Sequence, residues 1–184
     1  VDQFLYERYF SAAPRAGICL ECGAYDGVAE SSCKFFAETL GWKAINIEAS
    51  PPIFRRLEQN RPNDINIHAA LSDANGIIEF THAYHPIHGE TFGNGAVCHL
   101  PDHRADLDAM GCTYQTWNIP RITFRDVVEQ YELKRLDLMV LDVEGHELAV
   151  LDGMCDAKVM PSVLCIEVGH LGIERVTQKL SKLG

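Results

Sequence analysis

The sequence predicts an α/β domain in which helices cover both faces of a doubly wound, mostly parallel sheet. Short apolar segments alternate with segments of helical character along most of the 184 residues. Most of these segments are continuously apolar over several residues and do not alternate with polar ones, which is typical of strands that helices bury on both faces. With 47% hydrophobic residues, a chain of this length can build a sizeable core. We therefore expect a single domain over residues 1–184.

Seven segments are expected to be extended, and most of them end in polar residues. The strongest is LDLMVLDVEG, which is apolar on both faces until Asp142. Asn75 and Gly76 form a turn signal before another extended segment. In chain order, the extended segments are residues 17–22, 43–49, 65–73, 77–83, 118–124, 136–145 and 162–169.

Helical segments are expected between the strands, and several of them carry signals for a helix end. The first has an amphipathic stripe and is expected to end at Pro14 and Gly17. Gly41 suits the C-terminus of the second helix, and Thr123 with Asp126 resembles a capping box. The expected helices are residues 2–13, 30–41, 51–60, 124–133, 146–154 and 173–183.

Residues 82–117 show no clear periodicity, and we expect them to form a long irregular insertion. The segment is rich in glycine, histidine and aspartate, and loops of this length are uncommon unless they are functional. Its histidines and its first cysteine match no zinc-binding spacing, so no metal site is expected. These residues are His82, His85, His88, Cys98, His99 and His103.

The composition excludes several classes of partner. The formal net charge of −10 disfavours nucleic acid and anionic membranes, because both would repel the chain. No apolar stretch is long enough for a transmembrane helix, and no signal-like start is visible after Val1. Cys19 and Cys22 form a CxxC on one expected strand, where residues three apart point to opposite faces. We interpret them as buried apolar residues in a reducing, cytoplasmic protein.

Polar residues follow five of the expected strands, at the point where each strand ends. In open α/β sheets, ligands bind beyond the carboxyl ends of the strands. Several carboxylates at one edge would repel one another without a role, so their presence indicates a shared ligand site. The strand ends are Glu21-Cys22-Gly23, Glu48, Ser72-Asp73, Asp142-Val143-Glu144 and Gly169-His170.

The turn after the first strand favours a cationic ligand over a dinucleotide. Its glycines, Gly23 and Gly27, lack the G-x-G-x-x-G spacing, and Asp26 inside the turn would oppose a pyrophosphate. S-adenosylmethionine carries a sulfonium and an ammonium group, which an acidic rim attracts. Its carboxylate could accept hydrogen bonds from backbone N–H groups of the turn. Glu48 could then accept both ribose hydroxyls, and Ser72 with Asp73 could meet the adenine.

These motifs resemble the FkbM family of S-adenosylmethionine-dependent methyltransferases. The resemblance covers about residues 17–168 and rests on ECGAYDG, LGWKAINIEASPPIFRRLEQNR, HAALSD, ITFRDVV and LDLMVLDVEGHELAVLDG, of which DVEGHE is the most specific. It implies a Rossmann-like sheet of the class I methyltransferase type, with Asp142 near the methyl donor. The residues expected at the cofactor are Glu21, Gly23, Ala24, Asp26, Gly27, Glu48, Ser72, Asp73, Asp142 and Val143.

Two features depart from the commoner family pattern. The turn begins with Glu and contains Tyr25 and Asp26, which resembles a subgroup with E-x-G-A-x-D-G. Methyltransferases of this class normally continue after the fifth helix into an antiparallel strand pair, whereas this sequence stops at Gly184. We therefore expect either that the sheet lacks its last two strands or that another segment completes it.

The resemblance implies O-methylation of a small molecule such as a sugar or a polyketide. A hydroxyl acceptor needs a general base, for which we favour His170, with Asp142 and His146 as the other candidates. Phe92, Tyr114 and Trp117 are expected either to line the acceptor pocket or to hold the insertion on the core. The alternatives are a non-catalytic S-adenosylmethionine-binding domain and, less favoured, an NAD(P)-dependent oxidoreductase.

Overall fold

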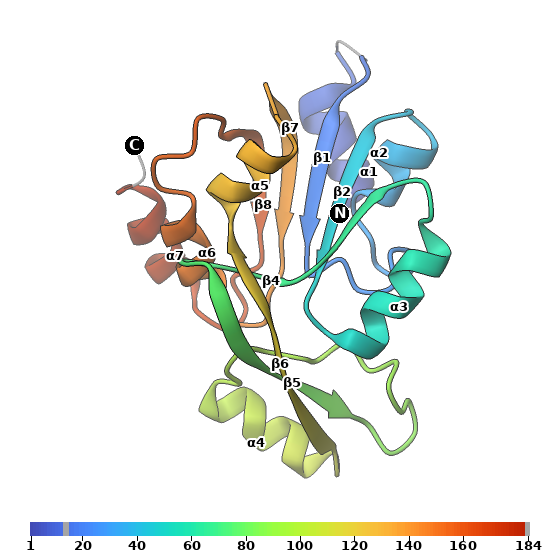
Figure 1. Ribbon diagram of the computed structural model, residues 1–184, viewed down its shortest axis with the longest axis vertical. Coiled ribbons are helices and arrows are strands. Elements are labelled where there is room, and N and C mark those ends of the chain that lie inside the picture. The colour runs from blue at the N-terminus through green and yellow to red at the C-terminus, as the bar shows by residue number, and fades with distance from the viewer. Residues whose placement is uncertain (13–14, 183–184) are drawn as a thin grey trace.

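A computed structural model describes residues 1–12 and 15–182, and its core is a parallel sheet of five strands (Figure 1). All neighbouring strands run parallel, in the order β3-β2-β1-β7-β8. This arrangement confirms the predicted α/β class with a mostly parallel, Rossmann-like sheet. The strands are β1 Ile18–Cys22, β2 Lys43–Glu48, β3 Ile65–His68, β7 Leu136–Leu141 and β8 Pro161–Ile166.

The strand order reverses between β1 and β7. The chain proceeds outward from β1 to β3 and then returns to the other side of β1, so the carboxyl ends of β1 and β7 lie next to each other. Cys22 pairs with Leu141, which places Gly23 directly beside Asp142. A Cβ atom on Gly23 would lie 1.7 Å from the Asp142 carbonyl oxygen, and Gly23 has a φ of +77°. Only glycine fits at this topological switch point, where open α/β sheets bind their ligands.

Two hydrophobic clusters lie on the two faces of the sheet, as a doubly wound fold requires. One cluster joins Leu20, Cys22 and Met139 to residues of α5 and α6. The other joins Cys19 and Leu138 to residues of the N-terminal helical segment and α2. Cys19 and Cys22 therefore point to opposite faces, as predicted. The helices next to the sheet are α1 Asp2–Leu5, its π-helical continuation Tyr6–Phe10, α2 Lys34–Glu38, α3 Pro51–Asn60, α5 Phe124–Gln130, α6 Glu147–Gly153 and α7 Ile173–Leu180.

The expected helix signals are confirmed where the structure describes them. The Thr123 hydroxyl accepts a hydrogen bond from the Asp126 N–H at 3.2 Å and caps α5. Gly41 has a φ of +67° and its N–H donates to the Ala37 carbonyl beyond the end of α2. The expected helix end at Pro14 and the last residue of the expected C-terminal helix lie outside the described residues. Within residues 1–12 and 15–182, no helix combines the length and the apolar character needed to cross a bilayer.

Helix α2 begins four residues later than the sequence predicts. Glu30 has a φ of +59°, which a right-handed helix excludes. The buried Glu21 carboxylate accepts hydrogen bonds from the Ser31 hydroxyl and the Ser32 N–H. These bonds hold residues 30–33 against the end of β1 in place of a first helical turn.

The expected strand over residues 65–73 is two strands in two different sheets. After β3, Ala69 donates its N–H to the Glu48 carbonyl, and the chain continues into β4, Ala70–Ser72. Strand β4 pairs with β6, Thr113–Thr123, which also pairs with β5, Gly76–Tyr84. A continuous apolar pattern does not show that a strand changes partners, and this is why the sequence prediction is wrong here.

The expected irregular insertion over residues 82–117 is also corrected. Its two ends belong to the β5–β6 hairpin, and residues between them form α4, Pro101–Ala109. The hairpin is half exposed, and only His103 and Leu107 of α4 are buried, so neither element carries a strong apolar period. Residues 76–123, called the lobe below, extend past the carboxyl ends of the parallel strands (Figure 1).

Candidate functional site

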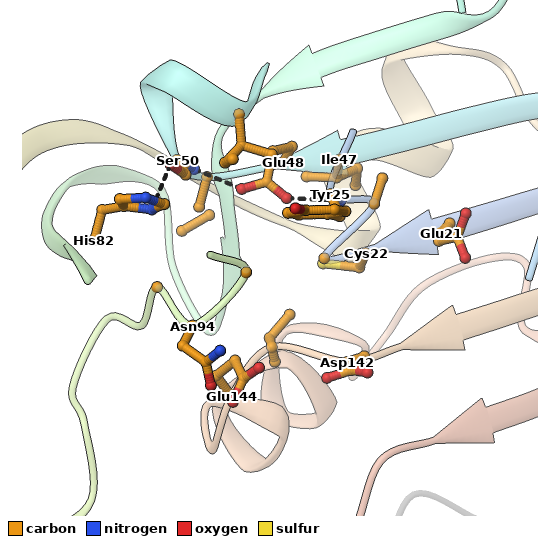
Figure 2. A pocket seen from close by; sticks show the side chains of 18 of the residues that line it. Glu21, Cys22, Tyr25, Ile47, Glu48, Ser50, His82, Asn94, Asp142 and Glu144 are labelled. Carbon is orange, nitrogen blue, oxygen red and sulfur yellow. Dashed lines mark hydrogen bonds between the residues drawn. The ribbon is translucent and has the colours of Figure 1, made fainter. Parts of the chain in front are cut away.

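A cavity of about 500 Å³ opens at the carboxyl edge of the sheet, between the strand ends and the lobe (Figure 2). Its volume lies in the range of small-molecule sites. The lining combines the ends of β1, β2 and β7 with part of the lobe. The residues are 21–25, 29–32, 47–50, 53, 69–71, 80, 82, 88, 91–95, 97, 140, 142–144 and 146. The cavity therefore lies at the switch point, where sequence analysis expects the ligand.

The turn after β1 is closed onto β2. The N–H groups of Gly23 and Ala24 both donate to the Ile47 carbonyl, at 3.0 and 3.1 Å. The Tyr25 N–H donates to Glu48 Oε2 at 3.0 Å. These three N–H groups already have partners, which corrects the expectation that the turn offers them to a ligand carboxylate. Gly23 and Ala24 line the cavity as backbone walls.

Asp26 and Gly27 lie outside the cavity lining. Asp26 Oδ1 accepts hydrogen bonds from the N–H groups of Val28 and Ala29, at 2.9 and 2.8 Å, and so shapes the turn. Gly27 packs on α3, since a Cβ atom there would lie 2.6 Å from Arg61 and from Leu57. Both residues support the turn, and neither lines the cavity.

Glu48 is buried at the end of β2 and faces the cavity (Figure 2). Its Oε1 accepts a hydrogen bond from the Ser50 N–H at 2.7 Å, and its Oε2 accepts the one from Tyr25. Burial raises the pKa of Glu48 to about 7, although these N–H groups favour the ionised form. Each oxygen accepts one backbone bond and has a second lone pair available for a ligand.

The raised pKa of Glu48 predicts a specific pH dependence of stability. The folded state holds the Glu48 proton up to about pH 7, whereas the unfolded chain releases it near its ordinary pKa of about 4.3. The contribution of Glu48 to the free energy of unfolding is therefore fully present below the pKa that Glu48 has in the unfolded chain. This contribution is lost as the pH rises through 7. Between pH 5.5 and 8.5 we expect the free energy of unfolding to fall by about 2 kcal/mol more in the wild type than in Glu48→Gln. Urea titrations at both pH values measure this difference; equal pH slopes for the two proteins would contradict it.

The turn after β7 carries two more carboxylates, those of Asp142 and Glu144, into the cavity. Buried Glu147 braces this turn, because its Oε1 accepts hydrogen bonds from the N–H groups of Val143 and Gly145, at 3.0 and 3.2 Å. Asp142 lines the cavity, and its pKa is raised to about 6 by desolvation in the cavity wall and by the Glu167 and Glu147 carboxylates. Glu147 thus supports the turn.

The cavity is strongly acidic. Among its described lining residues there are five carboxylates and neither a lysine nor an arginine. In their ionised form these carboxylates repel a pyrophosphate and attract a cation. The sequence argument placed this preference on Asp26, whereas the structure places it on Glu21, Glu30, Glu48, Asp142 and Glu144.

The wall between β2 and the lobe is apolar, and three of its seven residues are alanines. It is suited to a flat, uncharged ring. Ser72 and Asp73 are not part of this wall, because β4 leaves the parallel sheet and carries them past the cavity. Ser72 Oγ instead lies 3.0 Å from His146 Nε2. The wall consists of Ala49, Ile53, Ala69, Ala70, Leu71, Phe80 and Val97.

Comparison with known families identifies the domain. The Methyltransferase FkbM domain model matches residues 21–184. The chain belongs to the FkbM methyltransferase family. No curated protein and no solved structure matches the chain. The matched range begins at Glu21, the first residue that lines the cavity, and it includes every other lining residue.

Several lining residues of this FkbM domain were missed by the sequence analysis. His82 is fully buried, and its Nδ1 lies 3.0 Å from the Ser50 hydroxyl, which extends the Glu48 network into the lobe (Figure 2). Asn94 lines the cavity between two glycines. A Cβ atom on Gly95 would lie 2.6 Å from the Phe80 ring. The GNG sequence was therefore a signal of close backbone approach.

The aromatic residues expected at the acceptor pocket have different roles in the FkbM domain. Phe92 lines the cavity. Tyr114 donates its hydroxyl hydrogen to Asp108 at 2.6 Å, and Trp117 packs on the small cluster around Phe80. These two residues hold the lobe together and lie outside the cavity lining.

His170 reaches the cavity of the FkbM domain only through another side chain. Its Nε2 lies 2.7 Å from Glu144 Oε2, and Glu144 lines the cavity whereas His170 does not. On its other side, the His170 ring stacks on His103, with ring centroids 4.3 Å apart. Of the three candidate bases, Asp142 and His146 line the cavity directly.

Proposed function

We propose that this FkbM domain transfers the methyl group of S-adenosylmethionine to a hydroxyl group of a small molecule. The acidic cavity at the switch point, with the Glu48 carboxylate at the end of β2, is the observation that supports this proposal. Family membership supports methyl transfer as the reaction. The cavity supports the choice of cofactor, because its carboxylates complement a sulfonium and an ammonium group.

Each part of the cofactor has a complementary surface in the cavity. The two oxygens of Glu48 accept the ribose hydroxyls, and the apolar wall formed around Ala69 and Ala70 packs against the adenine. Asp142 and Val143 flank the methionine end, where Asp142 attracts the ammonium or the sulfonium. Gly23 and Ala24 provide a further surface for the methionine end of the cofactor. Ser72, Asp73, Asp26 and Gly27 are not assigned to the cofactor, because they do not line the cavity.

The reaction is an in-line displacement. The acceptor oxygen bonds to the methyl carbon while the carbon–sulfur bond breaks, and S-adenosylhomocysteine leaves with the sulfur electron pair. The acceptor hydroxyl loses its proton to a group at the cavity wall, where Asp142, Glu144 and His146 are exposed to the acceptor and His170 lies behind Glu144. Positioning of the two reactants provides much of the rate enhancement.

The acceptor is expected to enter from the side of the lobe. His88, Thr91 and Phe92 line this part of the cavity and offer both polar and aromatic contacts. Such a surface suits a hydroxylated molecule, such as a sugar or a polyketide, that presents rings and hydroxyl groups together.

A ligand-dependent melting experiment tests the choice of cofactor. We expect S-adenosylmethionine and S-adenosylhomocysteine to raise the melting temperature, because a ligand at 100 times its Kd stabilises the folded state by about 2.7 kcal/mol. NAD and NADP should have no effect, since the cavity repels their pyrophosphate. Stabilisation by NAD alone would support an oxidoreductase and contradict the proposal.

A further inference from the structure

A cluster of metal-ligating side chains lies next to the cavity. His103 comes from α4, Glu144 from the turn after β7, and His170 from the segment after β8. One ligand atom of each lies within 4.8 Å of the other two. His170 Nε2 is 2.7 Å and His103 Nδ1 is 3.9 Å from Glu144 Oε2. The three residues are far apart in the sequence, so only the fold brings them together.

His103 has a nitrogen atom without a partner inside this cluster. The residue is 8% exposed, and its Nδ1 is buried without a hydrogen bond. Its Nε2 contacts Asn94 Oδ1 at 3.2 Å. An amide oxygen only accepts hydrogen bonds, so Nε2 carries the hydrogen and Nδ1 of the neutral ring carries the lone pair. A lone pair that faces a carboxylate oxygen 3.9 Å away is unfavourable unless a proton or a metal ion lies between them.

We propose that His103, Glu144 and His170 bind one divalent transition-metal ion of the Zn²⁺ or Fe²⁺ type. Two imidazoles and one carboxylate are the donors of catalytic zinc and non-haem iron sites, whereas Mg²⁺ and Ca²⁺ prefer oxygen ligands alone. Ligand atoms bound at about 2.0–2.2 Å lie about 3–3.6 Å from one another. The separations of 2.7 and 3.9 Å lie on either side of this range, and all three ligand atoms lie within 4.8 Å of one another, so side-chain rotations would complete the site.

The surroundings of the cluster hold the three ligands in place. Asn94 fixes the His103 ring through Nε2, as partners of ligand histidines do in metal sites. Glu147 braces the turn that carries Glu144, whose φ of +55° is unusual for a residue with a side chain. His99 also contacts Asn94, with its Nε2 2.9 Å from the carbonyl oxygen, but among the described residues its ring is not part of the group whose ligand atoms lie together.

The role of the ion rests on the proposed function. Glu144 and Asn94 line the cavity, so an ion held by Glu144 would lie at the cavity wall, where a three-ligand site could offer its open position to the acceptor. A hydroxyl oxygen bound there would lose its proton more easily, because the ion stabilises the alkoxide. His103 and His170 thus act on the acceptor through the ion, although neither lines the cavity.

Titration of chelator-treated protein with Co²⁺ and Zn²⁺, without S-adenosylmethionine, tests the site. We expect one ion per chain, with visible absorption of bound Co²⁺ and a calorimetric signal for Zn²⁺. His103→Ala should weaken binding by more than about 100-fold, since even outer partners of metal ligands contribute 10–100-fold. The control is His85→Ala, which removes another histidine of the same lobe, one that does not line the cavity, and should leave metal affinity unchanged.

Two outcomes would overturn the metal site: no stoichiometric binding, or equal affinity in the wild type and in His103→Ala. Glu144→Gln keeps the side-chain shape and should also lose metal affinity, which covers the case that His103→Ala unfolds. Melting with S-adenosylmethionine in the presence of chelator separates the two proposals. Cofactor binding without metal binding rejects only the metal site, whereas metal binding without cofactor binding rejects only the proposed function.

Discussion

Replacing Glu48 by alanine is expected to weaken S-adenosylmethionine binding by about 100-fold or more. A hydrogen bond to a charged group contributes about 1.5–3 kcal/mol, and the variant loses both bonds to the ribose. It also leaves the N–H groups of Tyr25 and Ser50 without their acceptor, so the turn that lines the cavity loosens. Calorimetric titration of the variant and the wild type with the cofactor measures this loss.

Two further variants make the result specific to Glu48. Glu58→Ala removes an exposed carboxylate from α3 and should bind the cofactor as the wild type does. Glu48→Gln keeps the shape and one acceptor oxygen, so its affinity should lie between those of the wild type and Glu48→Ala. An unchanged Kd in Glu48→Ala would place the ribose elsewhere.

Replacing Gly23 by alanine is expected to destabilise the fold by about 4 kcal/mol or more. The new Cβ atom would overlap the Asp142 carbonyl, and a left-handed φ costs an alanine about 1–2 kcal/mol in addition. The ends of β1 and β7 would have to separate. For a chain of this length, the melting temperature should fall by about 10 °C, which a thermal melt measures.

Gly41 provides a matched control for Gly23. It has a similar φ of +67°, but a Cβ atom there meets nothing within 4 Å. Gly41→Ala should therefore cost only about 1 kcal/mol, the backbone part of the effect. If the two variants melt at the same temperature, the close approach of Gly23 to Asp142 contributes nothing to stability.

The parallel sheet was predictable because its strands are buried on both faces. The segment Leu136–Leu141 is apolar except for Asp137 and is buried throughout, and this pattern fits few other environments. The strand ends were predictable for a related reason. Once the strands are parallel, Glu21, Glu48 and Asp142 must share one edge, and the structure brings all three into one cavity.

The lobe was not predictable from local pattern. Its hairpin and α4 are half exposed and bury few residues, so the sequence over 82–117 appears irregular. The change of partner after Ala69 follows from contacts between distant segments. As a result, sequence analysis placed Ser72 and Asp73 at the cavity and missed His82 and Asn94, which the lobe contributes.

Side chains inside the turns show a second limit of sequence reasoning. Asp26 and Glu48 are both carboxylates near a strand end, yet Asp26 bonds to its own turn while Glu48 faces the cavity. The expected base His170 lies behind Glu144 and stacks on His103, a neighbour 67 residues earlier in the chain. Whether a carboxylate or an imidazole faces a ligand depends on its hydrogen-bonding and packing partners. The spacing of residues in the sequence does not show which partners these are.

A crystal structure of the protein with S-adenosylhomocysteine tests most directly whether the acidic cavity is the cofactor site. The ribose hydroxyls should lie within hydrogen-bond distance of the Glu48 carboxylate. The adenine should pack against Ala69 and Ala70, and the homocysteine end should lie beside Asp142. A ligand bound outside this cavity, or inside it with the ribose away from Glu48, would contradict the assignment.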